Sequence, residues 1–245
     1  MAQLRYELLR IRLSDGLETT VYVVAHPRSA ANVRAVCFDD ARHLDRWCVA
    51  HQQPEAIVAG FFVRDPWRPL GEVRIDGRPV VHEPIAEPFG AARGCVHLAP
   101  GGAIHIAARA DLPDEPDGDL VQAGPILVAG GRVVLDGSDR EGFSAGAAQF
   151  DSDITAERHP RCALGITDDE VLAVCCDGRR TGVDAGLDLP ELARVFVSLG
   201  ATDAINLDGG GSATLVHRGH LLNRPYSSVD QPGPESRPVV TALTF

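Results

Sequence analysis

Apolar and polar residues alternate along much of the chain, which predicts short β-strands joined by tight turns. Residues 4–13 and 19–25 follow this pattern on either side of Ser14-Asp15-Gly16 and predict a hairpin, with a bulge near Leu8-Leu9. Three further hairpins are predicted at dipeptides that lie between similar apolar flanks: Asp76-Gly77, Gly101-Gly102 and Gly130-Gly131. Strands therefore dominate the predicted fold.

Continuous apolar runs predict strands that are buried on both faces. Residues 56–62 form one such run and residues 203–207 form another. Residues 162–166 are expected to pair with residues 171–176 through the turn Thr167-Asp168-Asp169. Two polar stretches predict long connections, namely residues 111–119 and 136–153.

Two segments instead carry apolar residues at intervals of three and four, which predicts amphipathic helices. One lies within residues 40–51. The other begins at Asp188, which forms an Asp-x-x-Glu capping box with Glu191, and ends at Gly200. Isolated helices among many hairpins predict an α+β fold with a mixed, strand-rich sheet and few amphipathic helices.

Length and composition predict one globular domain over residues 1–245. Hydrophobic residues make up 44% and charged residues 23%, with 25 glycines and 17 prolines, which excludes collagen-like, coiled-coil and disordered classes. All 23 basic residues are arginine, so no lysine is available for Schiff-base chemistry or a P-loop. The net charge of -11 disfavours nucleic acid and anionic membranes and leaves arginine clusters as the candidate anion sites.

The six cysteines show no C-x-x-C pair and no regular spacing of a zinc or disulfide framework. The first residues lack the apolar core of an export signal, and no apolar run reaches the roughly 18 residues that a membrane span needs. We therefore expect a reduced, cytoplasmic protein without a membrane span. The oligomeric state does not follow from the sequence.

Acidic residues stand where two predicted strands end. Asp208 precedes Gly209-Gly210-Gly211-Ser212, a loop whose backbone N–H groups can approach an oxyanion or a sugar without obstruction by a Cβ. Asp177 follows the strand at 171–176 and precedes Arg179, and Arg161 begins the neighbouring strand. Paired carboxylates can serve as acid, base or nucleophile, and arginine can bind phosphate through two hydrogen bonds.

Each of these features also has a plain structural explanation. The glycine loop can be a wide bulge in which Asp208 accepts from its own loop amides. Asp177-Gly178 can be a turn with solvated arginines, and Arg161 can be an ordinary edge residue.

Other chemistries lack their markers. G-K-[ST], G-x-G-x-x-G and G-x-S-x-G motifs are missing from the sequence. Four histidines can face one another across hairpins, but no third ligand is fixed for a metal. We therefore predict neither a metal nor a cofactor. The four histidines are His97, His105, His217 and His220.

The segment Asn206-Leu207-Asp208-Gly209-Gly210-Gly211-Ser212-Ala213-Thr214 resembles the most specific motif of the phosphodiester glycosidase family. The resemblance extends from about residue 57 to the C-terminus and is densest after residue 159, so residues 1–56 are less clearly covered. Flanking segments that also match are Arg161-Cys162-Ala163-Leu164-Gly165, Asp177-Gly178-Arg179, Glu191-Leu192-Ala193, Asn223-Arg224-Pro225 and Arg237-Pro238-Val239.

The resemblance implies an α+β hydrolase that cleaves the glycosidic C–O bond of a sugar-1-phosphodiester and leaves the phosphate on the other alcohol. The partner would be a small-molecule or oligosaccharide sugar phosphate. It implies an acidic centre of Asp208 and Asp177, with Glu191 ranked second because its capping role already explains it. Residues implied to bind substrate are Arg161, Arg179, Asn206, Gly209, Gly210, Gly211, Ser212, Gly60 and Phe61.

Two departures from the family pattern leave other functions open. The segment Val58-Ala59-Gly60-Phe61-Phe62 lacks the family's usual Asn, and Cys162 replaces a usual Thr. Loss of a buried amide would change sugar specificity or abolish turnover. The alternatives are a non-catalytic carbohydrate-phosphate binding module with a degenerate site, and a structural partner of other proteins.

Overall fold

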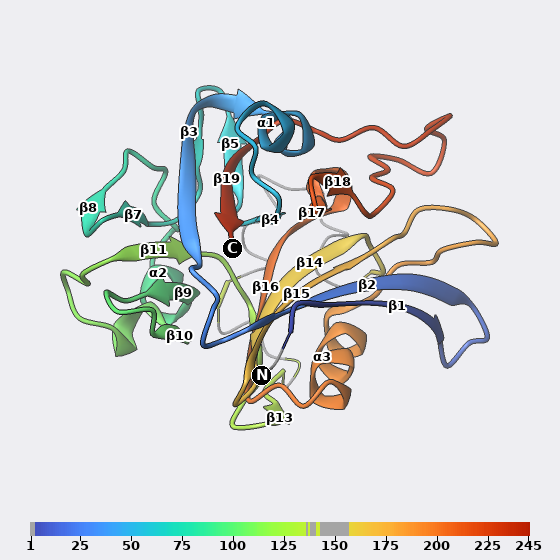
Figure 1. Cartoon of the computed structure of the whole chain (residues 1–245), viewed down its shortest axis with the longest axis horizontal. Coiled ribbons are helices and arrows are strands. Elements are labelled where there is room, and N and C mark those ends of the chain that lie inside the picture. Colours follow the sequence, from blue (N-terminus) through green and yellow to red (C-terminus); the bar gives the residue numbers. More distant parts are fainter. Residues whose placement is uncertain (1–2, 136, 138–140, 143–156) are drawn as a thin grey trace.

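The computed structural model describes residues 3–135, 137, 141–142 and 157–245, and β-strands are the most abundant secondary structure in this part of the chain (Figure 1). Most of the predicted connection at 136–153 lies outside the described residues. Every ladder between the described strands is antiparallel, and the isolated bridge between Leu70 and Glu83 is parallel. The strand-rich α+β class is confirmed.

A seven-stranded sheet in the order β1-β2-β15-β14-β16-β12-β13 forms the base of the molecule. Its strands are β1 (Arg5–Arg12), β2 (Glu18–Pro27), β12 (Ile126–Ala129), β13 (Arg132–Val133), β14 (Arg161–Ile166), β15 (Glu170–Cys176) and β16 (Asp203–Gly209). The predicted pairing of residues 162–166 with 171–176 is confirmed as β14 and β15.

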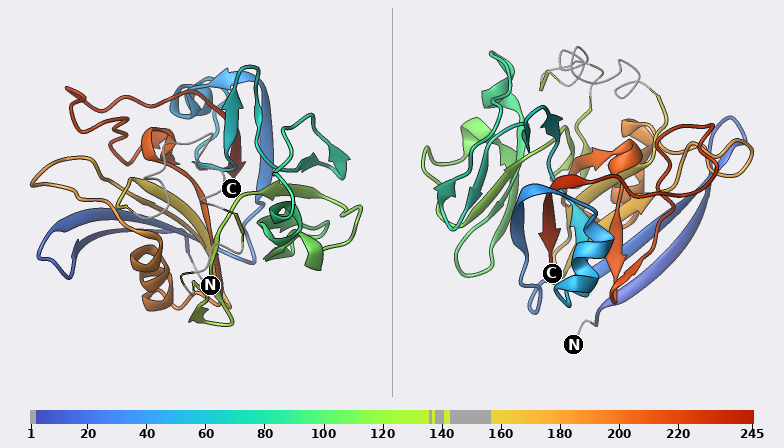
Figure 2. Two further views of the ribbon diagram at one scale, coloured as in Figure 1. Left: turned by 180° about the vertical axis from the view of Figure 1, so that it is seen from behind. Right: turned by 90° about the horizontal axis from the view of Figure 1, so that it is seen from above.

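Two five-stranded sheets and a small hairpin lie on one side of this base (Figures 1 and 2). The first, in the order β10-β9-β11-β7-β8, consists of β7 (Val73–Ile75), β8 (Arg78–Pro79), β9 (Gly94–Leu98), β10 (Ile104–Ala108) and β11 (Asp119–Gln122). The second, in the order β18-β17-β4-β19-β3, consists of β3 (Arg34–Arg42), β4 (Ala56–Val58), β17 (Leu215–His217), β18 (His220–Leu221) and β19 (Val239–Thr244). The hairpin pairs β5 (Phe62–Arg64) with β6 (Trp67–Pro69).

The seven-stranded sheet separates two apolar cores because side chains alternate between the faces of a strand. On β2, Val21 and Val23 face the cluster that contains the residues of α3 (Leu189–Ser198). Tyr22 and Val24 face the larger cluster, which includes residues of the second five-stranded sheet. The sheet is thus covered by a helix on one face and by further sheets on the other.

The helix α3 forms as its sequence predicts. The side chain of Asp188 accepts a hydrogen bond from Glu191 N at 2.6 Å, and Glu191 accepts one from Asp188 N at 3.0 Å. This reciprocal pair confirms the capping box. Two shorter helices are described, α1 (Leu44–Ala50) within the predicted residues 40–51, and α2 (Phe89–Ala92).

The four predicted hairpins are confirmed, but the bulge near Leu8-Leu9 is wrong. The register of β1 and β2 runs without interruption from Arg5 opposite Ala25 to Arg12 opposite Glu18. Leu8 simply lies exposed on an edge strand, while Leu9 packs against the α3 core. Consecutive leucines therefore need no extra residue in the strand.

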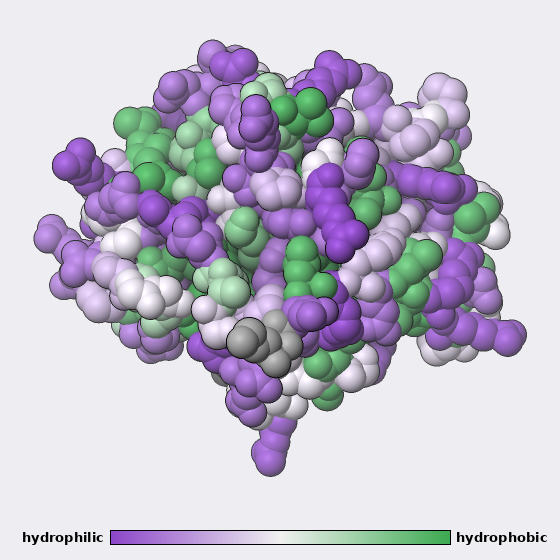
Figure 3. Space-filling model, viewed as in Figure 1, coloured by the Kyte–Doolittle hydropathy of each residue, from purple (hydrophilic) through white to green (hydrophobic). Residues whose placement is uncertain are grey.

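The surface in Figure 3 carries apolar residues in several small groups that polar residues separate. No helix among the described residues is both long and apolar enough to traverse a bilayer.

We predict that Asp188→Ala lowers the free energy of unfolding by about 1 kcal/mol, because the first turn of α3 loses the acceptor for Glu191 N. Urea denaturation measures the change. Arg194→Ala, on the exposed face of the same helix, is the control and should change stability by less than about 0.5 kcal/mol. Equal losses in the two variants would contradict the capping role.

Candidate active site

The pairing of β15, β14 and β16 brings Asp177 and Asp208 to the same end of these central strands of the seven-stranded sheet. Cys176 of β15 lies opposite Arg161 of β14, and Arg161 lies opposite Gly209 of β16. Asp177 and Asp208 are the immediate neighbours of these paired residues, so two segments distant in sequence place their carboxylates at one end of the sheet.

A bulge in β16 sets the direction of the Asp208 region. Ala163 lies opposite Asn206 whereas Arg161 lies opposite Gly209, so β16 carries one extra residue between these pairs. A bulge bends a strand and re-aims the side chains beside it. Asp208 N donates to Ala59 O at 2.8 Å, which ties the bulge to the segment that follows β4.

The consecutive glycines allow two guanidinium groups to approach the backbone. A Cβ on Gly210, whose φ is +58°, would lie 3.4 Å from Arg179 Nη1 and Nη2. A Cβ on Gly211 would lie 2.9 Å from Arg237 Nη2 and would clash with Ser227. A side chain at position 211 would therefore displace Arg237, which explains why this position holds a glycine.

Asp208 is a nearly buried carboxylate among positive charges. It is 9% exposed, and burial raises its pKa to about 6, because removal from water disfavours the ionised form. Hydrogen bonds from Gly209 N and the Ser212 hydroxyl, and then the charges of Arg237 and Arg64, act in the opposite direction and lower the pKa. The group is therefore mostly ionised at pH 7 but protonates in mildly acidic solution.

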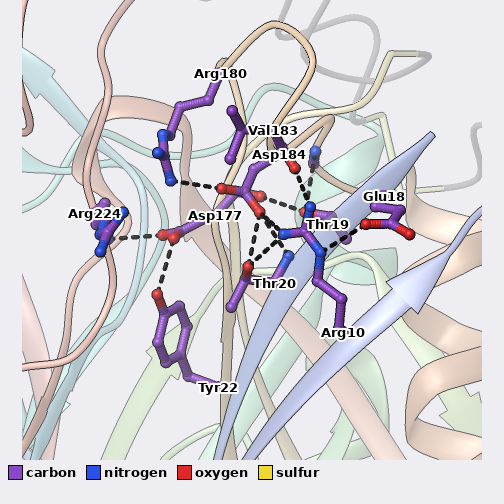
Figure 4. A network of polar contacts seen from close by, with 11 residues as sticks. Arg10, Glu18, Thr19, Thr20, Tyr22, Asp177, Arg180, Val183, Asp184 and Arg224 are labelled. Atoms are coloured by element: carbon purple, nitrogen blue, oxygen red, sulfur yellow. Dashed lines mark hydrogen bonds and ion pairs between the residues drawn. The ribbon is translucent and has the colours of Figure 1, made fainter.

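Asp177 has neutral donors on both of its oxygens (Figure 4). The Tyr22 hydroxyl donates to Oδ2 at 2.9 Å and Arg224 N donates to Oδ1 at 2.7 Å. Asp177 is 1% exposed, and burial raises its pKa although the bonds from Arg224 and Tyr22 lower it. These contacts fix the side chain between β2 and the loop at residues 222–238.

A third buried carboxylate, Asp184, holds the loop that follows Asp177 (Figure 4). It is 1% exposed and accepts from Arg10 Nη1, Arg180 Nη1 and the backbone and hydroxyl of Thr20 at 2.7–2.9 Å. Asp184 was not predicted from the sequence. It lies opposite Arg180 in an antiparallel bridge across a tight turn, and the signal was an acid that follows an arginine across the turn-forming residues Thr181-Gly182-Val183.

The loop at residues 222–238 links the surroundings of the two aspartates. Besides the Arg224–Asp177 bond, Arg179 Nη1 donates to Ser227 O at 2.5 Å. The loop is held at its far end by Ser236, whose hydroxyl contacts His43 Nδ1 at 3.0 Å and Asp45 Oδ1 at 2.9 Å. Arg237 follows directly and faces Gly211.

Arg161 lies at the predicted edge, but the described bonds of its guanidinium lead to the other face of the sheet. Nε donates to Leu187 O at 3.2 Å and Nη2 donates to Glu157 O at 3.0 Å. Leu187 belongs to the α3 core. The structure thus places Arg161 behind β14, whereas Arg179 faces the glycine loop.

Glu191 lies at the N-terminus of α3 in an ion pair with Arg158. Arg158 Nη2 is 2.6 Å from Glu191 Oε1, and Arg158 Nη1 also contacts Asp15. Together with the capping bond, these contacts give Glu191 a structural role.

Six residues predicted to contact substrate are buried, namely Gly60, Phe61, Arg161, Asn206, Gly211 and Ser212. Asn206 is fully buried, and its Nδ2 donates to Gly124 O at 3.0 Å and Leu207 O at 2.8 Å. A Cβ on Gly60 would lie 3.0 Å from Val121, and Phe61 is part of the large core. Asn206, Gly60 and Phe61 therefore pack beneath the site, where they hold the backbone that surrounds it.

Among the residues that the structure describes, no three His, Cys, Asp or Glu side chains are arranged to hold a metal. The histidines singled out above do face one another across hairpins, His97 opposite His105 with ring centroids 5.7 Å apart and His217 opposite His220. His217 Nδ1 is 2.9 Å from Glu55 Oε2, and His97 Nε2 is 2.7 Å from Asp117 O.

The sequence analysis did not single out Arg64 or Arg237 as site residues. The positive charges of both lower the pKa of Asp208. The charges of Arg64 and Arg179 in turn lower the pKa of Arg237. Their distance from Asp208 in the sequence hides this grouping; the one signal was Arg237 within a matching family segment. The guanidinium groups that face the glycine loop can bind a phosphate, and the ionised carboxylate of Asp208 can attack carbon or activate water.

Comparisons with known proteins agree with this architecture. The phosphodiester glycosidase family model matches residues 52–245. The catalytic domain of zebrafish N-acetylglucosamine-1-phosphodiester alpha-N-acetylglucosaminidase, auto-inhibited by its pro-peptide, is similar with a TM-score of 0.73 and 19% identity, over 99% of this chain and 82% of that one. No curated protein matches significantly in sequence.

Two further solved structures share the fold. A hypothetical protein from Synechocystis has a TM-score of 0.66 and 19% identity, over 98% of this chain and 61% of that one. A protein from Burkholderia pseudomallei has a TM-score of 0.68 and 18% identity, over 94% of this chain and 74% of that one.

We predict that Asp208→Asn stabilises the folded protein at neutral pH. Because the pKa rises from 3.8 to about 6 on folding, the folded state binds more protons between these values, and ionised Asp208 opposes folding above pH 6. Removing the charge should add up to about 3 kcal/mol at pH 7.5, and the gain should vanish below about pH 4.

Urea denaturation of both proteins from pH 4 to pH 8 measures this difference. Asp230→Asn, which changes an exposed carboxylate in the same loop region, is the matched control. A destabilised Asp208→Asn protein at pH 7.5 would show that the arginines outweigh the cost of burial.

Proposed function

Because this chain belongs to the phosphodiester glycosidase family, we propose that it hydrolyses the glycosidic C–O bond of a sugar-1-phosphodiester. The family membership supports a glycosidase-type hydrolase. The name of the similar zebrafish enzyme makes an N-acetylglucosamine-1-phosphodiester the first compound to test.

The observation that carries the proposal is the position of Asp208 directly before a glycine loop that two arginines face. Arg179 and Arg237 face the glycine loop that follows Asp208, and the charges of Arg64 and Arg237 act on its carboxylate. A diester phosphate has one negative charge, which paired guanidinium groups can bind. Asp208 would then lie near the anomeric carbon attached to that phosphate.

In the proposed reaction, the bond between the anomeric carbon and the phosphate oxygen breaks, and the phosphate leaves with the bonding electrons. Asp208 acts as nucleophile or as the base that takes a proton from the attacking water. Water supplies the hydroxyl of the free sugar, and the second alcohol keeps the phosphate. The arginines stabilise the charge on the departing phosphate, so little general-acid assistance is needed.

We propose a positioning role for Asp177. Both of its oxygens are engaged by Tyr22 and Arg224 N, which suits a residue that holds the 222–238 loop. This loop supplies Arg237 and accepts the hydrogen bond from Arg179. Arg161, Glu191 and Asn206 would support the surrounding backbone through the contacts described above.

A carbohydrate-phosphate binding module without turnover is the second candidate. The full engagement of Asp177 favours it, because Tyr22 and Arg224 N occupy both oxygens of one carboxylate of the predicted acidic pair and leave Asp208 as the other. A thermal shift with a sugar-1-phosphodiester but no released sugar would support this candidate.

The cytoplasmic location stays a prediction. All six cysteines are free thiols and five of them are buried, which is compatible with a reducing compartment. Fractionation of cells that express the complete gene product tests it.

We predict that Asp208→Asn lowers kcat by at least a hundredfold, because the amide can neither attack carbon nor accept a proton from water. Release of reducing sugar from a panel of synthetic sugar-1-phosphodiesters, with and without chelator, measures turnover. Asp230→Asn is the control for the same chemical change and should keep full activity. An Asp208→Asn enzyme with wild-type kcat would refute the assigned role.

We predict that kcat/KM decreases as the pH falls below about 6, because protonation of Asp208, whose pKa is about 6, removes the reactive form. The decrease should approach tenfold per pH unit. A phosphodiester does not titrate in this range, so the acidic limb reports the enzyme. Rates that rise between pH 6 and pH 5 would instead require a protonated Asp208.

A further inference from the structure

His159 is a buried histidine that has no part in the proposed reaction. It is 5% exposed and lies two residues before β14, at the end of the sheet where Asp177 and Asp208 lie. Its backbone bonds to Leu187 in both directions, because His159 N donates to Leu187 O at 3.2 Å and Leu187 N donates to His159 O at 3.1 Å. The backbone of His159 is therefore fixed.

The segment His159-Pro160 packs against both parts of the proposed anion site. A Cβ on Gly178, which precedes Arg179, would lie 2.7 Å from the proline nitrogen. A Cβ on Gly209, in the glycine loop, would lie 2.7 Å from the proline carbonyl oxygen, and Gly210 N donates to that same oxygen at 2.7 Å. The segment thus lies where the two parts meet, and the glycines make this close approach possible.

The imidazole of His159 contacts the guanidinium group of Arg179. Arg179 Nη2 lies 3.3 Å from His159 Nδ1, and because an arginine side chain can only donate, His159 accepts at Nδ1. The other terminal nitrogen, Nη1, donates to Ser227 O at 2.5 Å. Both nitrogens lie 3.4 Å from the position of a Cβ on Gly210. Two acceptors on different nitrogens therefore orient the guanidinium group toward the glycine loop.

The charge of the acceptor determines how well an arginine that it holds can bind an anion. A carboxylate at the position of Nδ1 would form an ion pair with the guanidinium group and repel an incoming phosphate. A neutral imidazole fixes the direction of the guanidinium group and adds no negative charge beside it.

We propose that His159 is a positioning residue of the phosphate site, where it holds Arg179 toward the glycine loop as an uncharged acceptor. This inference rests on the proposed function, in which Arg179 binds the phosphate. The affinity for a phosphate group then depends on two properties of the side chain at position 159: it accepts a hydrogen bond, and it carries no negative charge.

The first test measures the affinity of the whole chain for N-acetylglucosamine 1-phosphate and for inorganic phosphate by calorimetry. His159→Asn keeps an uncharged acceptor at the δ position, so both affinities should stay within about twofold of wild type. His159→Asp has nearly the same shape but should bind at least about tenfold more weakly, because its carboxylate pairs with Arg179 and repels the anion. His159→Leu should lose about fivefold, because the guanidinium group loses one acceptor. His51→Leu, at the exposed end of α1, is the control and should keep wild-type affinity.

A double-mutant cycle tests whether His159 acts through Arg179. In an Arg179→Met background, His159→Leu should cause no further loss of phosphate affinity. Losses that add in the double variant would overturn the proposal, and so would equal affinities of the His159→Asn and His159→Asp variants. Urea denaturation shows whether each variant is folded. If His159→Leu does not fold, the comparison of His159→Asn with His159→Asp still decides the question.

These measurements separate the positioning role from the proposed hydrolysis. Neither ligand is a diester, so the affinities are measured without turnover. The expected order of affinities supports the role of His159 even if no diester releases sugar, and that result would overturn the proposed hydrolysis alone. A wild-type protein that binds neither phosphate would overturn the positioning role, whether or not it hydrolyses a diester.

Discussion

The antiparallel pairing of β14 with β15 on one side and β16 on the other is the constraint on which the candidate site depends. The ladder with β15 places Cys176 opposite Arg161, and the ladder with β16 places Gly209 opposite it. Asp177 and Asp208 are the chain neighbours of Cys176 and Gly209, so the two ladders also fix their positions. Register is strongly specified in a sheet that is buried on both faces, because a one-residue slip would exchange the two cores. The bulge in β16 interrupts its ladder with β14 and lies beside Asp208.

Burial and charge act against each other at this edge of the sheet. Asp208 loses hydration and its pKa rises, while Arg64 and Arg237 recover part of the lost stabilisation of its ionised form. Arg237 has the converse environment, in which burial and the neighbouring arginines lower its pKa. An anionic ligand would relieve this repulsion among guanidinium groups. The glycines make the crowding possible, since a Cβ at Gly211 would occupy the space of Arg237.

Local patterns predicted most of the fold, including the hairpins, the β14–β15 pair and the capping box of α3. They also predicted that Asp177 and Asp208 occupy strand ends, because each follows a buried apolar run. The surroundings of these residues could not be predicted in the same way. Arg64, Arg237, Tyr22 and Asp184 join the site through tertiary contacts, and the direction of the Arg161 side chain depends on which face of β14 it occupies. Periodicity carries no information about such long-range proximity.

The buried hub at Asp184 has a consequence for where this protein divides into parts. Its partners Arg10 and Thr20 lie on the first two strands, and Tyr22 from the same hairpin holds Asp177. These residues precede residue 52, at which the family match begins. The start of the family match is therefore not a boundary of the folded unit. A fragment that began there would lack β1 and β2 of the seven-stranded sheet and would expose the apolar flank of β15. The chain should not be shortened to the region of the family match.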